Sequence, residues 1–183
     1  MAIKKGDFVE LDYTGKTADG EKVVFDTTDA DVAKQEGIHS QKTQYGPIIV
    51  AIGEGQLLPG LDKQLVGQDV GQHTFHIPDV DGFGKKSAAN MQLVPLKFFR
   101  KENINPFPGL QVNIDDKVGQ VRSVSGGRVI VDFNHPLASK DLEYEVTVHR
   151  MVTDKKEQLQ ALFKLFGFPV EGIVVQGNKA VIN

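Results

Sequence analysis

Apolar and aromatic side chains beside tight turns are the residues of this sequence that could form a reactive cavity. They occur in four places: Tyr13 before Thr14-Gly15, Phe25 before Asp26, Leu57-Leu58 before Pro59-Gly60, and Phe83 between Gly82 and Gly84. Taken singly, each is explained as well by packing in the core of a β-domain or by a solvated turn. If they share one cavity, it would act by binding and by excluding water.

Motifs for nucleophiles, metals and nucleotides are absent from the sequence. Without cysteine the chain has no thiolate ligand, thiol nucleophile or disulfide. No phosphate-binding Gly-x-x-x-x-Gly-Lys-Ser/Thr motif occurs, and Gly53-Glu54-Gly55 lacks the third glycine of a dinucleotide loop. His73 and His76 are three residues apart on a predicted strand, so they face opposite sides and do not favour a shared metal. We therefore expect neither a metal nor a cofactor.

The composition is that of a globular protein with unevenly distributed charge. Of the 183 residues, 40% are hydrophobic and 25% are charged, which excludes a disordered or fibrous chain. Residues 1–84 carry 14 acidic and 7 basic side chains, whereas residues 85–129 carry 3 acidic and 8 basic ones. This basic block between acidic flanks predicts a module with its own surface character.

No segment of the sequence is suited to a membrane. The longest apolar run, residues 48–52, is far shorter than the roughly 20 residues of a transmembrane helix. Lys4 and Lys5 near the start are not followed by the apolar core of a signal peptide. We expect a cytoplasmic protein without membrane association.

Hydrophobic periodicity in residues 1–84 favours strands with two short helices. The predicted strands cover residues 8–13, 22–25, 48–52 and 72–77. A helix capped by Thr28 is expected to end near Gly37. A second helix opens at Pro59 and places Leu61 and Leu65 on one face.

The remaining sequence is also rich in strands and ends with a helix. The predicted strands cover residues 94–99, 111–114, 119–124, 128–133 and 142–148. Asp154 and Glu157 predict an acidic capping box for a helix with Leu159, Leu162, Phe163 and Phe166 on one face and Gly167 at its end. A hairpin follows, with residues 172–175 against 179–182 and Gly177-Asn178 at the turn.

Several motifs, in one order along the chain, resemble a known family. Asp12-Tyr13-Thr14-Gly15 and Val24-Phe25-Asp26-Thr27 resemble the Tyr-Thr-Gly and Phe-Asp signatures of FKBP-type peptidyl-prolyl isomerases. Residues 52–62 with 67–71 are similar to the strand-to-helix segment of that family, and residues 134–146 to its closing loop and strand. The middle block has the placement of the insert-in-flap domain in SlyD-like and archaeal long-type members. The resemblance extends from residue 1 to about residue 150.

The resemblance implies an α+β fold, in which an antiparallel half-barrel sheet wraps around a short helix. Residues 1–84 and 130–152 would form the isomerase domain, and residues 85–129 a small β-rich inserted domain. Residues 153–183, a helix plus hairpin, would be a C-terminal extension like the one linked to dimerisation in long archaeal relatives. A homodimer through this extension is one arrangement that the resemblance suggests.

The resemblance also implies a substrate pocket and an activity, the rotation of Xaa-Pro bonds in folding polypeptides. Its catalytic residues would be Tyr13, Phe25, Asp26, Leu58, Phe83 and Tyr144, and its further substrate contacts Ile48, Leu57 and Leu61. Two departures stand out: the chain has no tryptophan for the pocket floor, where Leu61 stands instead, and the flap tyrosine of the family is replaced by Phe83. The loss of one substrate hydrogen bond is therefore expected.

The inserted block suggests a second binding activity. Its apolar content is high for so small a domain, and the resemblance implies chaperone binding of unfolded polypeptides through Leu93, Leu96, Phe98 and Phe99. The basic residues around it, including Arg100, Lys101, Arg122 and Arg128, would suit acidic clients. Without a recognition motif, nucleic-acid binding is the weaker interpretation. The alternatives to an isomerase are a non-catalytic holdase chaperone and a ribosome or RNA docking module.

Overall fold

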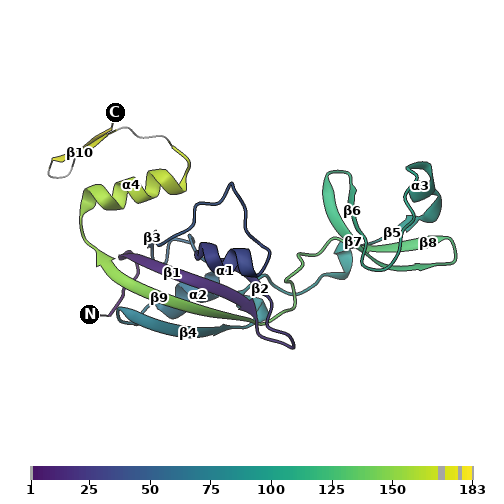
Figure 1. Ribbon diagram of the computed structural model, residues 1–183, viewed down its shortest axis with the longest axis horizontal. Helices are drawn as coiled ribbons and strands as arrows, with labels where there is room; N and C mark the ends of the chain where they lie inside the picture. Colours follow the sequence, from purple (N-terminus) through teal and green to yellow (C-terminus); the bar gives the residue numbers. More distant parts are fainter. Residues whose placement is uncertain (1, 169–171, 177–178, 183) are drawn as a thin grey trace. The chain divides into compact units, whose positions relative to one another are not determined.

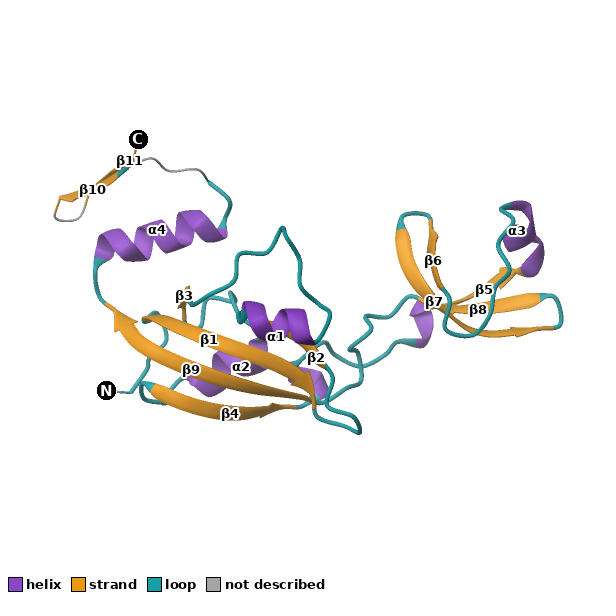
Figure 2. Cartoon of the chain, viewed as in Figure 1, coloured by secondary structure: helices purple, strands orange, loops and turns teal. Residues whose placement is uncertain are grey.

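The computed structural model describes residues 2–168, 172–176 and 179–182, and its contacts divide the chain into two compact units. The first unit combines Met1–Gly82 with Lys140–Asn183, and the second is Phe83–Ser139. Each unit is built on an antiparallel sheet with short helices (Figure 1, Figure 2). The chain thus leaves the first unit, folds a second sheet and returns, which is the path of an inserted domain.

A five-stranded sheet forms the frame of the first unit. Its strands are β1 (Phe8–Thr17), β2 (Val24–Thr27), β3 (Ile48–Ala51), β4 (Gly71–Ile77) and β9 (Leu142–Val152). Their order is β2-β1-β9-β4, and β3 pairs with the first half of β1, on the same edge that β2 occupies further along. The long strands β1 and β9 therefore form the middle of the curved sheet.

One face of this sheet packs on a short helix. The buried residues of β9 alternate along the strand: Leu142, Tyr144, Val146 and Val148. Helix α2 (Pro59–Leu65) buries Leu61 and Leu65 completely. It approaches β4 so closely that a Cβ on Gly60 would lie 2.5 Å from Cγ2 of Ile77. The predicted half-barrel wrapped on a helix is confirmed.

The first helix of the chain begins one residue later than predicted. Helix α1 (Ala30–Gln35) is capped by Asp29, whose side chain accepts hydrogen bonds from the backbone N–H groups of Asp31 and Val32. The predicted cap, Thr28, is 6% exposed and its hydroxyl donates to Asp12 instead. Both residue types suit an N-cap, and the long-range partner of Thr28 decides between them.

The second unit is a four-stranded sheet with its own core. Its strands, in the order β5-β8-β7-β6, are β5 (Met91–Pro95), β8 (Arg128–Asp132), β7 (Lys117–Ser125) and β6 (Gln111–Ile114). Helix α3 (Leu96–Lys101) follows β5, and a 3₁₀ turn covers Ala88–Asn90; another covers Asp79–Asp81 in the first unit. The buried core of the second unit consists of Phe99, Val112, Val121, Val129 and Val131.

The inserted unit has wider bounds than predicted. Strand β8 pairs with β5 and β7, and its Val129 and Val131 complete the core of the insert. A boundary at residue 130, expected from the charge pattern, would cut this strand in two. The insert therefore extends over residues 83–139, and the Ser139 N–H donates to the Gly84 carbonyl where its two ends meet.

The predicted strand over residues 94–99 is wrong in its second half, because β5 ends at Pro95 and α3 begins at Leu96. Helical spacing turns Leu96 and Phe99 toward the core together and leaves Phe98 44% exposed. Strand alternation would have put Leu96 and Phe98 on one face. The run of apolar residues was too short for periodicity to separate the two conformations.

The C-terminal helix and hairpin form as predicted within the described residues. In helix α4 (Lys155–Leu165), the Asp154 side chain caps the backbone N–H of Glu157 at 2.8 Å. The second half of the predicted capping box is wrong, because the Glu157 carboxylate pairs with Arg150. Strand β10 (Ile173–Gln176) pairs with β11 (Lys179–Ile182), while the predicted turn at residues 177–178 lies outside the described residues. In the described part of the chain, no helix has the length and apolar character needed to cross a membrane.

Candidate active site

A bulge between β1 and β2 brings two neighbouring side chains to the same cluster. Gly15 pairs with Asp26 and Lys16 with Val24, so Phe25 is an extra residue on the shorter strand. A bulge re-aims side chains that a regular strand would send to opposite faces. The Phe25 ring packs edge-on against Tyr144, with centroids 5.8 Å apart. The Tyr13 hydroxyl donates a hydrogen bond to Asp26 Oδ2, with 2.9 Å between the two oxygens.

Tyr144 lies at the centre of this aromatic cluster of Tyr13, Phe25 and Tyr144. It is 4% exposed and pairs with Gly15 on one side and with Phe75 on the other. Its ring centroid is 5.8 Å from that of Tyr13 as well as from that of Phe25. The three rings therefore line one apolar wall, and Asp26 stands at its exposed side.

Gly15 is a residue whose importance the sequence analysis missed. A Cβ at this position would lie 2.8 Å from Cε1 of Tyr144 and 2.9 Å from Cζ of Phe25, well inside van der Waals contact. Any larger residue would push the two rings away. The Tyr-Thr-Gly signature carried this information, but only the fold tells that its glycine lies under the rings.

A second missed feature is the polar support of Tyr13. The Tyr13 N–H donates to Thr28 Oγ1 at 3.0 Å, and this hydroxyl donates to Asp12 Oδ1 at 2.7 Å. The other oxygen of Asp12 is 2.7 Å from Nε2 of His149. Thr27 Oγ1 also donates to the Tyr13 carbonyl at 3.2 Å. The backbone of Tyr13 is thus held by buried hydroxyls, which no local pattern predicts.

The environment keeps both tyrosines of the cluster protonated. Burial raises the pKa of Tyr13 well above its usual range, and the Asp26 carboxylate beside it raises that pKa further. Burial and the same carboxylate also raise the pKa of Tyr144. Because a phenol donates its proton only in the neutral form, Tyr13 remains a hydrogen-bond donor at physiological pH.

The leucines and isoleucine of the predicted pocket belong to the same unit as the rings. Ile48 begins β3 and pairs with Leu11. Leu61 is 0% exposed in α2, so its predicted contact with the substrate is wrong: it fills the core of the first unit. Leu57 and Leu58 are half-buried just before α2. Their segment is held in place by the buried carboxylate of Asp62, which accepts hydrogen bonds from the N–H groups of Gly53 and Gly55 at 2.7 and 3.2 Å.

The other predicted site residues lie in the second unit. The ring of Phe83 stacks on His135 with centroids 4.2 Å apart, so its part in the substrate pocket stays a prediction. Leu93 and Phe98 are 56% and 44% exposed and can meet a partner. Phe99, however, is 1% exposed, so its predicted contact with clients is wrong: it fills the core of the insert. Leu96 packs against the same core.

The chemistry available at the aromatic cluster is that of an apolar surface with one polar side. Among the described residues, no three His, Asp or Glu side chains are grouped as a metal ion would require. The cluster offers ring faces, one neutral phenol that donates a hydrogen bond, and a carboxylate that holds that phenol. Such surroundings suit the binding of a weakly hydrated group and a reaction in which no atom is transferred.

A half-barrel sheet on a short helix, a bulged strand carrying Phe25-Asp26 and an inserted β-domain together define the fold of a prolyl isomerase with an extra domain. Comparison with known proteins supports this class. Residues 92–137 match a family model described as FKBP26, IF domain. The chain is 33% identical over 147 residues to a short-type peptidyl-prolyl cis-trans isomerase of Methanocaldococcus jannaschii, covering 80% of this chain and 92% of that protein.

Bacterial relatives give the same result. A probable FKBP-type 16 kDa peptidyl-prolyl cis-trans isomerase of Pseudomonas fluorescens is 33% identical over 108 residues, which is 56% of this chain and 71% of the relative. The FKBP-type isomerase SlyD of Treponema pallidum is 27% identical over 167 residues, or 88% of this chain and 85% of the relative. The chain belongs to the FKBP-type peptidyl-prolyl isomerase family, and the resemblance seen in its motifs is confirmed.

Proposed function

We propose that this protein catalyses cis–trans rotation about Xaa-Pro bonds in folding polypeptides, with Tyr13, Phe25, Asp26 and Tyr144 in its active site. The observation that carries the proposal is the aromatic cluster, in which the Tyr13 hydroxyl is held by Asp26 at 2.9 Å beside the two other rings. Membership of the family supports the reaction, and the cluster supplies surroundings that suit it.

The reaction needs a weakly solvating site more than a reactive group. Rotation about a peptide bond meets a barrier of about 18–20 kcal/mol, because the planar amide loses its resonance. Without resonance the carbonyl oxygen carries less charge and needs water less. A dry aromatic site therefore binds the twisted amide better than the planar one, and such differential binding accelerates the reaction.

The residues then take the following roles. The rings of Phe25 and Tyr144 form walls for the prolyl ring, with Ile48 and Leu57 beside it. The backbone N–H of Leu58 holds a substrate carbonyl, and Asp26 fixes the Tyr13 hydroxyl. A thousandfold acceleration requires about 4 kcal/mol, which desolvation with one or two hydrogen bonds can supply.

The inserted unit would act as a chaperone that binds unfolded chains. Its match to an insert domain of the family and the exposed side chains of Met91, Leu93 and Phe98 support this role. A client held by the insert stays at high local concentration near the prolyl pocket of the same chain. Each prolyl bond of the client can then visit the pocket repeatedly before the client leaves.

The C-terminal extension would serve in homodimer formation. In α4 and just beyond it, Leu165 and Phe166 are 49% and 66% exposed, and Phe168 is 61% exposed. Apolar side chains this exposed suit burial against a second copy of the chain. Sedimentation of the full chain and of a Phe166→Ser/Phe168→Ser variant tests this arrangement: loss of a dimer in the variant supports it, and a monomeric wild type overturns it.

Proline-limited refolding of a test protein examines the two activities together. We would compare the wild type, a Phe25→Ala/Asp26→Ala variant, and a variant with residues 85–138 replaced by a short glycine linker. The proposal expects faster refolding with wild type, slow refolding with the double variant, and retained peptide isomerisation with slow protein refolding when the insert is missing. If the wild type binds unfolded chains but accelerates neither reaction, the protein is a holdase and not an isomerase.

A further inference from the structure

The insert differs in charge from the rest of the chain. Residues 83–139 contain 8 basic and 4 acidic side chains, whereas the remaining residues contain 13 basic and 20 acidic ones. The distribution within the insert adds to this contrast, because, of its four carboxylates, Asp132 is buried, Asp115 and Asp116 lie in the β6–β7 turn, and only Glu102 is exposed near α3. The surface that meets a client is therefore cationic as well as apolar.

The register of the insert sheet defines one outward face. Val129 and Val131 point into the core, so Arg128, Ile130 and Asp132 point the other way. Their partners on β5 are Pro95, Leu93 and Met91, which share that outward face. Leu93 is 56% and Met91 41% exposed. We call the stripe of Met91, Leu93 and Ile130 the insert face.

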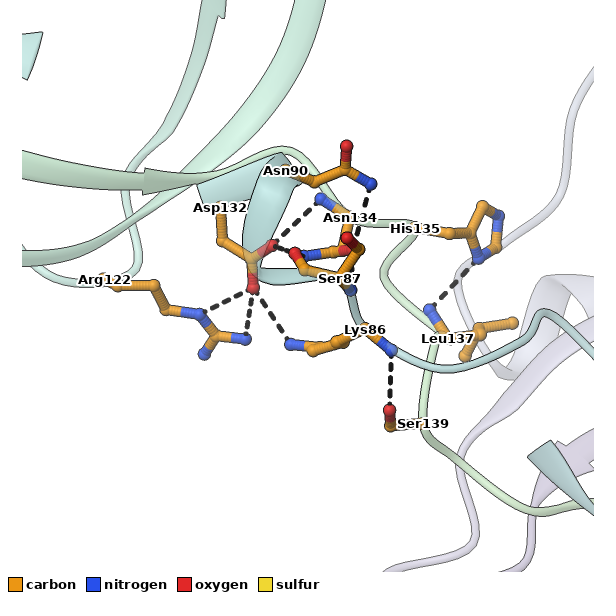
Figure 3. Close-up of polar contacts among 9 residues, drawn as sticks. All are labelled: Lys86, Ser87, Asn90, Arg122, Asp132, Asn134, His135, Leu137 and Ser139. Carbon is orange, nitrogen blue, oxygen red and sulfur yellow. Dashed lines mark hydrogen bonds and ion pairs between the residues drawn. The ribbon is translucent and has the colours of Figure 1, made fainter. Parts of the chain in front are cut away.

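One carboxylate on this face is hidden beneath two cations. Asp132, 5% exposed, accepts hydrogen bonds from Arg122 Nη2 and Lys86 Nζ, both at 3.0 Å, and from Asn134 (Figure 3). Burial opposes its ionisation, but the bonds from Asn134, Lys86 and Arg122 outweigh burial and hold the pKa of Asp132 well below its usual range. The charged group as a whole is therefore net positive, and its two cations are held in position.

A second set of cations lies at the other end of β8. The Leu96 N–H donates to the Gly127 carbonyl at 2.9 Å, which places the start of α3 beside the β7–β8 turn. This region carries four exposed cations, Lys97, Arg100, Lys101 and Arg128, for which the described residues provide no ion pair. We call these four residues the cationic rim. Phe98, 44% exposed, lies within it.

The remaining carboxylates of the insert do not neutralise this rim. Asp115 and Asp116 form the turn between β6 and β7, before Lys117, whereas Arg128 pairs with Ser125 at the far end of β7. Glu102 alone is near, as the residue that ends α3. One carboxylate among four cations leaves a strongly positive surface beside the exposed apolar side chains.

We propose that the insert selects unfolded segments in which Asp or Glu residues flank an apolar or aromatic stretch. This inference rests on the proposed chaperone function and names the clients it serves. The apolar stretch gives affinity by covering Leu93 and Met91 on the insert face, while the flanking carboxylates meet Arg122 at one end of β8 and the cationic rim at the other. The cations frame apolar side chains rather than follow a groove with stacking platforms, so a polypeptide fits better than RNA.

Binding of three fluorescent peptides to the full chain tests this selectivity. The peptides share one apolar core and carry at its two ends Asp-Glu, Ser-Gln or Lys-Arg pairs. We expect the acidic peptide to bind at least about fivefold more tightly than the basic one at low salt, since exposed pairs each contribute modestly. The ratio should approach one in about 1 M salt, where charges are screened within a few ångströms.

A charge-neutral variant and a matched control complete the experiment. Lys97, Arg100, Lys101 and Arg128 are changed to Gln together, and the control changes four exposed lysines of the first unit, Lys42, Lys140, Lys155 and Lys156, to Gln. The selectivity should disappear in the first variant and persist in the control, with unchanged isomerisation of a short peptide in both.

The binding results distinguish a failure of the charge selectivity from a failure of the chaperone function and from a preference for RNA. Equal binding of all three peptides by the wild type overturns the charge selectivity and leaves the chaperone function in place. Failure to bind even the neutral peptide overturns the chaperone function itself. A salt-sensitive RNA complex tighter than the acidic peptide complex overturns the choice of a polypeptide partner.

Discussion

Replacing Gly15 by alanine should damage catalysis by moving two rings at once. The new Cβ would lie 2.8 Å from Cε1 of Tyr144 and 2.9 Å from Cζ of Phe25, while ordinary contacts begin near 3.4 Å. Both rings must therefore retreat by roughly half an ångström or more, and such overpacking lowers the free energy of unfolding by about 1–3 kcal/mol. Misplacement of positioning groups by this order of distance costs about 10- to 100-fold in kcat/KM.

The assay is protease-coupled isomerisation of a proline-containing tetrapeptide, with stability measured in parallel by urea unfolding. Gly172→Ala is the matched control, because a Cβ there meets no atom within 4 Å, and it should leave both measurements unchanged. Replacing the neighbouring ring by a smaller side chain, in a Gly15→Ala/Phe25→Leu variant, should recover part of the lost stability, since the two positions are in contact. A Gly15→Ala variant that is stable and has wild-type kcat/KM would refute the assignment of the active site to these rings.

Substitutions at four further positions, Tyr13, Thr28, Phe98 and Phe99, test these contacts. Tyr13→Phe removes the donor to Asp26 and should lower the free energy of unfolding by about 0.5–1.5 kcal/mol; kcat/KM should fall several-fold, and an unchanged value would remove Tyr13 from the mechanism. Thr28→Val leaves the buried Tyr13 N–H without its acceptor, so we expect a loss of about 1–3 kcal/mol and lower kcat/KM. Thr28→Ser should restore both, and failure of that rescue would argue against the hydroxyl. Phe99→Ala should unfold the insert, at a cost of about 3–5 kcal/mol, whereas Phe98→Ala should keep it folded and weaken client binding. Hydrogen exchange measures the folding of the insert, and peptide binding measures its function. An insert that unfolds with Phe98→Ala and stays folded with Phe99→Ala would contradict the burial assignment.

Much of the fold could be predicted because its determinants are local. Alternation along β9 identifies a strand with one buried face, and Asp154 marks the start of α4 as its N-cap. The paired motifs around Tyr13 and Phe25 predicted a shared site, and the structure brings these two residues together around Tyr144. Each of these signals lies within a few residues of the element that it specifies.

Other features depend on partners that are distant in the sequence. Residues 128–133 were correctly predicted as a strand, but only pairing with β5 and β7 assigns it to the insert. Thr28 is a plausible helix cap by its type, but its hydroxyl donates to Asp12 and accepts from the Tyr13 N–H instead. The short run Leu96–Lys101 suited either a strand or a helix, and burial of Phe99 in the insert core selects the helix.

The site residues divide in the same way. Tyr13, Phe25 and Asp26 could be predicted as site residues from their motifs, because the Tyr-Thr-Gly and Phe-Asp signatures contain the phenol, the ring and the carboxylate. The role of Gly15 could not be predicted in this way, because its value lies in the absence of a side chain beneath rings that come from β2 and β9. A bulge decides how Phe25 and Asp26 are aimed, and its register appears only when β1 and β2 are paired.

We expect the water-poor aromatic site to accelerate prolyl rotation without transferring a proton. The most direct test is kcat/KM for isomerisation of a short prolyl peptide by the wild type, measured in H₂O and in D₂O. We expect clear acceleration with a solvent isotope effect near one, because no proton moves in the transition state. No acceleration, or an isotope effect of about two or more, would contradict it.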